Sequence, residues 1–175
     1  MRKALFAVAL SALSLSAVQA QTTPQIDRGR ELFTNAKKGV ACKTCHELGG
    51  VGKAIAPDLT NMASNGSVHS IVMTMHMTMT EHVVRVKTQT ASFPAILKQK
   101  YGDKTEYWDL DNIPPTLRTL YNNQIVSVER DEKWHHPPAL ANYTAQELAD
   151  VIAFLKFAAT GSKADIAASD INPNW

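Results

Sequence analysis

The stretch Cys42-Lys43-Thr44-Cys45-His46 decides how this chain of 175 residues is organised. Cys-x-x-Cys-His is the covalent attachment signature of c-type haem: each thiol adds to one vinyl group of the porphyrin, and the adjacent histidine supplies the proximal nitrogen to the iron. Two alternatives fit the residues less well, because a thioredoxin-like redox pair lacks this histidine and a zinc site needs a second pair of ligands. We therefore predict one covalently bound haem c, held by Cys42, Cys45 and His46.

The N-terminal segment has the three parts of a secretory signal. Arg2 and Lys3 precede an apolar run that reaches Leu15, and Ala20 ends a small-x-small cleavage site. We predict a signal peptide over residues 1–20 and export to the periplasm. The alternative, a membrane anchor, is disfavoured because the apolar run is too short to span a bilayer. After removal of this segment we expect no membrane anchor.

The charge of the exported chain disfavours one class of partner. Without Arg2 and Lys3, 16 basic residues stand against 16 acidic ones, so the net charge is close to zero. Such a balance gives no strong attraction to nucleic acid or to anionic lipid. We therefore expect no nucleic-acid partner.

The clearest helix lies near the C-terminus. Thr144 and Glu147 form a capping box, and an apolar stripe runs from Leu148 toward Gly161, a residue type that commonly ends helices. Beyond this helix, residues 163–175 have no periodicity. We expect them to form a loose C-terminal tail.

These features together resemble class I cytochromes c. In that family an N-terminal helix with the pattern Gly-x-x-Leu-Phe, matched here by Gly29, Leu32 and Phe33, precedes the haem motif. A loop with a proline follows the motif, and Pro57 matches it. The carbonyl of that proline accepts a hydrogen bond from the proximal imidazole in the family, so the resemblance implies this role for Pro57 toward His46.

The resemblance implies a mainly α fold, in which N- and C-terminal helices pack around one covalently bound haem. It gives a cytochrome c domain over residues 21–162, with an insert at about 63–133 before the last helix. It also implies an electron carrier rather than an enzyme: periplasmic single-electron transfer between oxidoreductases, or service as the cytochrome subunit of one. The implied partners are unidentified redox proteins and the cytochrome c maturation machinery.

The sixth iron ligand is the main departure from the family. Where many class I cytochromes carry a methionine before proline, this chain reads His136-Pro137-Pro138. Imidazole is a good iron ligand and a stiff loop aims it well, so we predict His136 as the distal ligand, with His135 as the alternative in register. Two interpretations stay open. One is a methionine from the insert, such as Met79, and the other is an open sixth site, typical of a haem enzyme or a ligand sensor.

The insert holds four methionines that alternate with threonine and histidine from Met73 to Met79. Family position favours a helix here, whereas threonine and valine content favours a strand. We predict a helix. Packing of the methionines in the core is one interpretation of their role. A copper site that uses Met75 and Met77 is another, because Cu(I) prefers soft thioether ligands.

Overall fold

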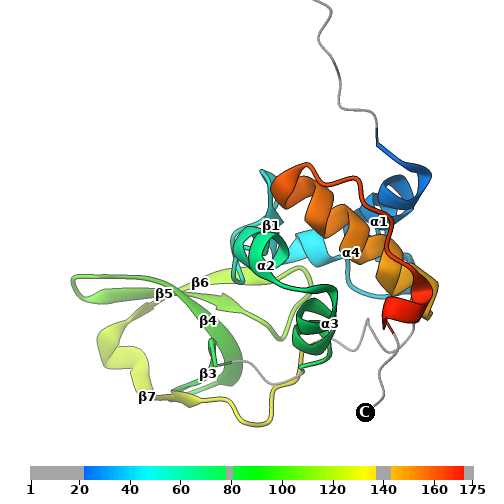
Figure 1. Cartoon of the computed structure of the whole chain (residues 1–175). Helices are drawn as coiled ribbons and strands as arrows, with labels where there is room; N and C mark the ends of the chain where they lie inside the picture. Colours follow the sequence, from blue (N-terminus) through cyan, green and yellow to red (C-terminus); the bar gives the residue numbers. More distant parts are fainter. Residues whose placement is uncertain (1–21, 78–80, 137–142, 172–175) are drawn as a thin grey trace, which may run out of the picture.

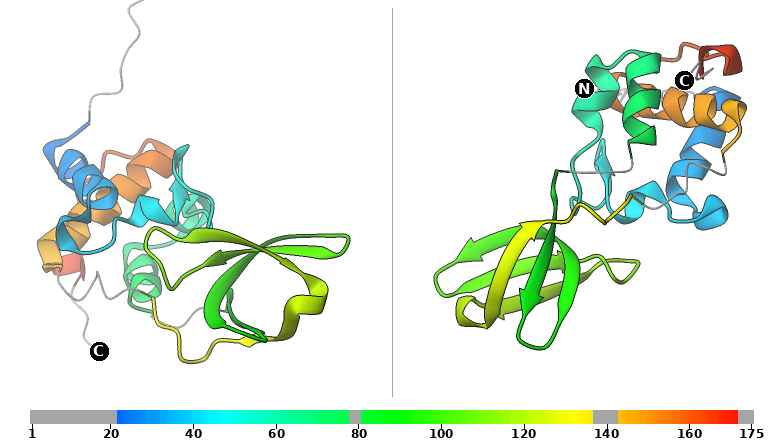
Figure 2. Two further views of the ribbon diagram at one scale, coloured as in Figure 1. Left: turned by 180° about the vertical axis from the view of Figure 1, so that it is seen from behind. Right: turned by 90° about the horizontal axis from the view of Figure 1, so that it is seen from below.

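The computed structural model describes residues 22–77, 81–136 and 143–171, which form two lobes (Figure 1). One lobe is helical and contains the first and last helices. The other is a curved antiparallel sheet that stands beside it, as the view from below also shows (Figure 2). The principal contacts between described elements lie within each lobe. The predicted signal peptide lies outside the described residues.

The last helix, α4 (Ala145–Thr160), has the predicted start and end. The Thr144 hydroxyl accepts a hydrogen bond from the Glu147 amide, and the Glu147 carboxylate accepts one from the Thr144 amide. The helix ends at Gly161, whose φ of +76° lies in the left-handed region that favours glycine. The capping box and the terminal glycine that the sequence indicated are therefore present.

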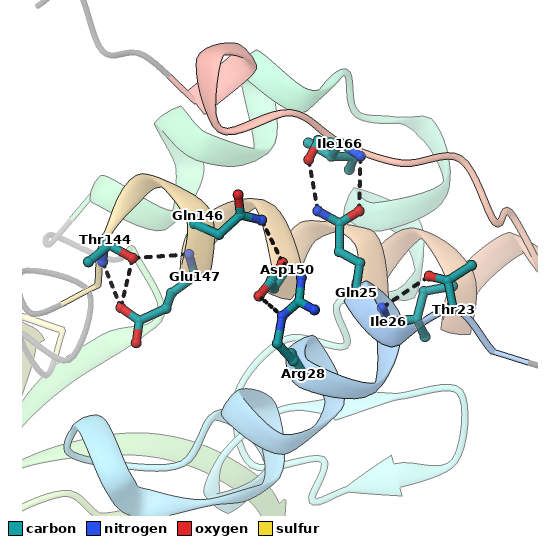
Figure 3. A network of polar contacts seen from close by, with 9 residues as sticks. All are labelled: Thr23, Gln25, Ile26, Arg28, Thr144, Gln146, Glu147, Asp150 and Ile166. Carbon is teal, nitrogen blue, oxygen red and sulfur yellow. Dashed lines mark hydrogen bonds and ion pairs between the residues drawn. The ribbon is translucent and has the colours of Figure 1, made fainter.

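The first helix, α1 (Pro24–Thr34), crosses α4 at close range. Gly29 makes this approach possible, because a Cβ atom at that position would lie 1.9 Å from the Asp150 carbonyl oxygen. Beside the crossing, Arg28 donates two hydrogen bonds to the buried Asp150 carboxylate, and Gln146 donates a third (Figure 3). Both the apolar stripe and this polar network tie the two helices together.

Short elements connect the two long helices and carry the haem motif. Helix α3 (Val68–His76) contains Met73 and Met75, so the first half of the methionine run is helical, and Met77 follows as the C-cap in an extended conformation. Its N-cap is Ser67, whose hydroxyl accepts a hydrogen bond from the Ser70 amide. The other short elements are η1 (Ala36–Lys38), η2 (Cys42–Thr44), β1 (Glu47–Leu48), β2 (Val51–Gly52) and α2 (Thr60–Asn65).

The described part of the C-terminal segment packs against the helical lobe, so the expected loose tail does not hold for residues 163–171. Ile166 and Ile171 are buried in the core of this lobe. The Gln25 side chain donates to the Ile166 carbonyl oxygen at 2.8 Å and accepts from the Ile166 amide at 3.0 Å (Figure 3). A short helix, η5 (Ala168–Ile171), ends the described chain.

The second lobe is a five-stranded antiparallel sheet with the order β6-β5-β4-β3-β7. The last strand lies beside the first, so the start of β3 and the end of β7 meet at one point. A small core of Val86, Phe93, Ala95 and Tyr107 covers one face. The strands are β3 (Val83–Thr88), β4 (Ser92–Tyr101), β5 (Lys104–Asp109), β6 (Thr116–Tyr121) and β7 (Ile125–Arg130), with η3 (Asn122–Gln124) between the last two.

The sheet overturns the prediction of a mainly α fold. About 39% of the described residues are helical and 27% are in strands, which is not a mainly α class I cytochrome fold. The strands fall inside the predicted insert, and some of them show the period of two that is typical of a half-buried strand. Strand β5, for example, alternates half-buried and buried side chains along its whole length. The prediction was wrong because the helical character of the family was extended to the insert, and the alternating pattern there was not used.

Candidate functional site

The haem motif lies on a tight turn at the surface of the helical lobe. Its first three residues form η2, and the amides of Cys45 and His46 both donate to the Cys42 carbonyl oxygen, at 3.2 and 2.9 Å. This turn keeps the two cysteines and the histidine on one short segment. Both cysteines are free thiols and half-buried. Burial raises the pKa of Cys42 to about 11 and also raises that of Cys45, so both are protonated at neutral pH.

His46 is held by a backbone oxygen from the loop that follows the motif. Its Nδ1 lies 2.8 Å from the Pro57 carbonyl oxygen, the hydrogen bond that the resemblance implies. Because a carbonyl can only accept, Nδ1 carries the proton, and Nε2 has the lone pair that a metal needs. Burial lowers the pKa of His46, and the bond to Pro57 opposes this effect. The imidazole is therefore favoured in its neutral, metal-binding form.

The loop around Pro57 is fixed by further backbone bonds to the motif. The amides of Ile55 and Ala56 both donate to the Cys45 carbonyl oxygen, at 3.0 and 2.8 Å. The hairpin of β1 and β2 packs the same segment from the other side, and the Lys53 amide donates to the His46 carbonyl oxygen. The position of the Pro57 oxygen thus follows from the fold of the motif itself.

His136 lies in the segment that follows strand β7, and its ring faces the haem motif. Its ring centroid lies 6.0 Å from that of His46, with 33° between the two ring planes. The indole of Trp134 packs edge-on against the His136 ring, with centroids 6.3 Å apart and planes at 83°. His136 is half-buried, whereas His135 is exposed. The structure therefore brings His136, of the two histidines, toward the motif.

These side chains fit a covalently bound haem in their chemistry. Two thiols stand in motif order, one imidazole presents Nε2, and a second imidazole lies across from it. Metal–nitrogen bonds are about 2 Å long, so a metal ion held between two imidazoles places their ring centres several ångströms apart. The observed 6.0 Å between His46 and His136 agrees with such a spacing.

The methionines of the insert, and Met62 just before it, lie in different environments. Met62 and Met75 pack against the helical core, whereas Met73 and Met77 are exposed at 39% and 64% of their surface. The predicted copper pair, Met75 and Met77, thus has one member in the core and one in solvent. Met79 lies outside the described residues. Within those residues, no group of three or more His, Cys, Asp or Glu side chains is arranged to hold a metal ion.

Asp131 is the residue of this site that sequence reasoning missed. It follows β7, and its carboxylate accepts hydrogen bonds from the amides of Lys133 and Trp134. A short acidic side chain that binds amides two and three residues later is a typical turn former. This signal was available in the sequence just before the histidine pair.

An open groove of about 750 Å³ runs beside the motif where the two lobes meet. Its helical side includes Lys43 and Thr44, the two residues between the cysteines, and Val51. Its sheet side is formed by Ile113 and Pro114, in the loop between β5 and β6. The outward side of the motif is therefore accessible and flanked by apolar side chains.

Comparison with protein families supports the same chemistry. No curated protein matches this chain. The family model Cytochrome c matches residues 26–112, a range that begins in α1, contains the motif and Pro57, and extends past the end of β5. A domain of this family implies covalently bound haem c and supports haem-based electron transfer in general. The family is generally one of electron carriers, and its domains are usually exported. The match over residues 26–112 thus supports a cytochrome c.

Proposed function

We propose that this chain is a periplasmic single-electron carrier with one haem c, attached through Cys42 and Cys45 and ligated by His46 and His136. The observation that carries the proposal is the 6.0 Å separation of the two imidazole rings. The two histidines belong to different segments: His46 precedes the inserted sheet in the sequence, and His136 follows it. The free thiols of the motif and the hydrogen bond from His46 to Pro57 support the same assignment.

Each protein group has a defined part in this proposal. Cys42 and Cys45 would hold the haem, since the addition of each S–H bond across one vinyl group would form a thioether and release no other product. Pro57 fixes the tautomer and orientation of His46, so that Nε2 is the ligand. When bound, the haem supplies one-electron exchange between ferrous and ferric iron. His46 and His136 would both be occupied as ligands of the iron, which would favour electron transfer over substrate binding.

The second imidazole has a consequence for the reduction potential. A methionine thioether as distal ligand raises the potential of a c-type cytochrome. An imidazole in the same place favours the ferric state, so we propose a carrier of lower potential than a His/Met cytochrome. Its redox partners would be proteins that exchange electrons at the motif side of the haem, beside the open groove.

Export of the chain is part of the same proposal. Residues 1–20 carry the pattern of a secretory signal. In the part of the chain that the structure describes, no helix has the length and apolar character needed to cross a bilayer. Haem attached by two thioethers is not lost by dissociation, which suits a carrier outside the cytoplasm.

The test is the electron paramagnetic resonance and near-infrared spectrum of the ferric holoprotein. We expect a six-coordinate, low-spin, bis-imidazole spectrum. His136→Ala should convert the haem to a high-spin or exchangeable form, and the matched control His135→Ala should leave the spectrum unchanged. An unchanged spectrum in His136→Ala would refute the distal assignment. Rapid carbon monoxide binding by the reduced wild-type protein would contradict a six-coordinate carrier.

A further inference from the structure

We propose that Asp131 is a positioning residue for the sixth haem ligand, and that through it the inserted sheet holds His136 toward His46. This inference rests on the proposed function. It assigns a role to the sheet lobe, which contributes none of the proposed haem ligands. Three sets of contacts lead from the sheet through Asp131 to the His136 ring.

The first contacts join Asp131 to the loop that carries His136. Its Oδ1 accepts hydrogen bonds from the amides of Lys133 and Trp134, each at 3.1 Å. Its carbonyl oxygen lies 3.4 Å from the same Trp134 amide. One carboxylate oxygen therefore closes the first turn of the loop. Hydrogen bonds to an ionised acceptor are stronger than neutral ones, so this turn is well held.

The second contacts join Asp131 to the edge of the sheet where β3 and β7 meet. Its amide donates to the Val83 carbonyl oxygen at 3.0 Å, which extends the pairing of the two strands by one residue. Its Oδ2 forms an ion pair with Arg85 Nη2 at 2.5 Å. That oxygen has no hydrogen bond among the described residues, so the contact is an ion pair rather than an aligned hydrogen bond.

The burial of Asp131 makes its ion pair with Arg85 important for stability. The Asp131 side chain is 3% exposed, whereas the Arg85 side chain is 39% exposed. A buried carboxylate is costly unless a cation and hydrogen-bond donors compensate its charge. Arg85 supplies the cation from the sheet, and the loop amides supply the donors. The carboxylate is therefore stable only while the sheet and the loop keep this relative position.

The third contact passes from the loop to the proposed ligand. Trp134, whose amide is bound by Asp131, packs its indole edge-on against the His136 ring at 6.3 Å. The His136 ring in turn lies 6.0 Å from the His46 ring. The chain of contacts is continuous from the sheet through Asp131 and Trp134 to the imidazole. Loss of the carboxylate should let the loop swing away and free the sixth position.

The chain offers a matched control in the same sheet. Asp109, in β5, is also buried, pairs with Arg118 at 2.5 Å, and accepts a hydrogen bond from the Asp111 amide at 2.8 Å. None of its described contacts reaches the His136 loop. Removal of either carboxylate should weaken the sheet lobe, but only removal of Asp131 should affect the haem.

The experiment measures the rate of cyanide binding to the ferric holoprotein, its high-spin fraction and its melting temperature. Asp131→Ala should raise the cyanide rate by about tenfold, the effect of losing hydrogen bonds to a charged acceptor. Asp131→Asn keeps an oxygen acceptor for the loop amides and should raise the rate by about threefold, since half of the arrangement remains. Asp109→Ala should lower the melting temperature to a similar extent and leave the cyanide rate unchanged.

The outcomes separate this inference from the proposed ligation. An equal rise in Asp109→Ala and Asp131→Ala would overturn the positioning role, as would wild-type rates in both Asp131 variants. If Asp131→Ala does not assemble a holoprotein, the rate for Asp131→Asn decides. Should His136→Ala itself leave the cyanide rate and the spectrum at wild-type values, the ligation by His136 fails and the inference fails with it.

Discussion

The imidazole rings of His46 and His136 lie 6.0 Å apart, although 90 positions separate the two residues in the sequence. The intervening chain forms α2, α3 and a complete sheet, and then returns to the motif. This return is possible because β7 pairs with β3, which brings the two ends of the inserted sheet together. An insertion whose ends meet in this way leaves the helices on either side free to pack as if it were absent.

Exchange of the distal imidazole for a thioether should raise the reduction potential. In His136→Met the soft ligand stabilises ferrous iron, and we expect an increase of about 0.2 V, within the range that axial ligands control. Spectroelectrochemical titration of the holoprotein measures this directly. His135→Met, which changes the exposed neighbour, should keep the wild-type potential. A potential that is the same in both variants would contradict ligation by His136.

Haem attachment and export can be checked together by mass spectrometry. When the chain is produced with a cytochrome c maturation system, the secreted protein should begin at Gln21 and carry the added mass of one haem. Cys42→Ala/Cys45→Ala should carry none, because no thiol is left to form a thioether. A wild-type protein with two haem masses, or one that retains residues 1–20, would contradict the corresponding part of the proposal.

The sequence predicted those parts of the fold that depend on local chemistry. The cap at Thr144 and the helix end at Gly161 depend on residues at the two ends of one helix, whereas the bond between His46 and Pro57 was implied by the resemblance to class I cytochromes c. The sheet was missed because the family position of this segment was taken to indicate a helix, although three of its four strand pairs join consecutive strands and only β3 and β7 are distant in the sequence. The turn at Asp131 has a local sequence signal, but its ion pair with Arg85, 46 positions earlier in the chain, has none.

The crossing of α1 and α4 should not tolerate a side chain at Gly29. A Cβ there would lie 1.9 Å from the Asp150 carbonyl oxygen and 2.8 Å from the Phe154 Cβ, so the helices would have to separate. We expect Gly29→Ala to lower the free energy of unfolding by about 3 kcal/mol or more, the range for overpacking at a tight contact. Urea unfolding monitored by circular dichroism provides the measurement.

A glycine in open space serves as the comparison for Gly29. Gly102 has a φ of +56°, and no atom lies within 4 Å of the point that a Cβ would occupy there. Gly102→Ala should therefore lower the free energy of unfolding by only about 1 kcal/mol, the strain of a side-chain-bearing residue at positive φ. Equal losses of stability in Gly29→Ala and Gly102→Ala would show that the helix crossing has more room than this packing implies.

The Asp150 carboxylate should make the stability of the helical lobe depend on pH below about 4. Burial raises its pKa, but hydrogen bonds from Arg28 and Gln146, together with the Arg28 charge, outweigh burial, so the pKa in the folded protein is below its ordinary value. A group of this kind stabilises the fold fully above its unfolded pKa, near 3.9, and loses that contribution as the pH falls through its folded pKa. Asp150→Asn should be less stable than wild type at pH 6, and the difference between the two proteins should shrink as the pH is lowered from 4 to 2. Parallel stability curves over this range, measured by urea unfolding, would show that the contacts of Asp150 with Arg28 and Gln146 do not favour its ionised form.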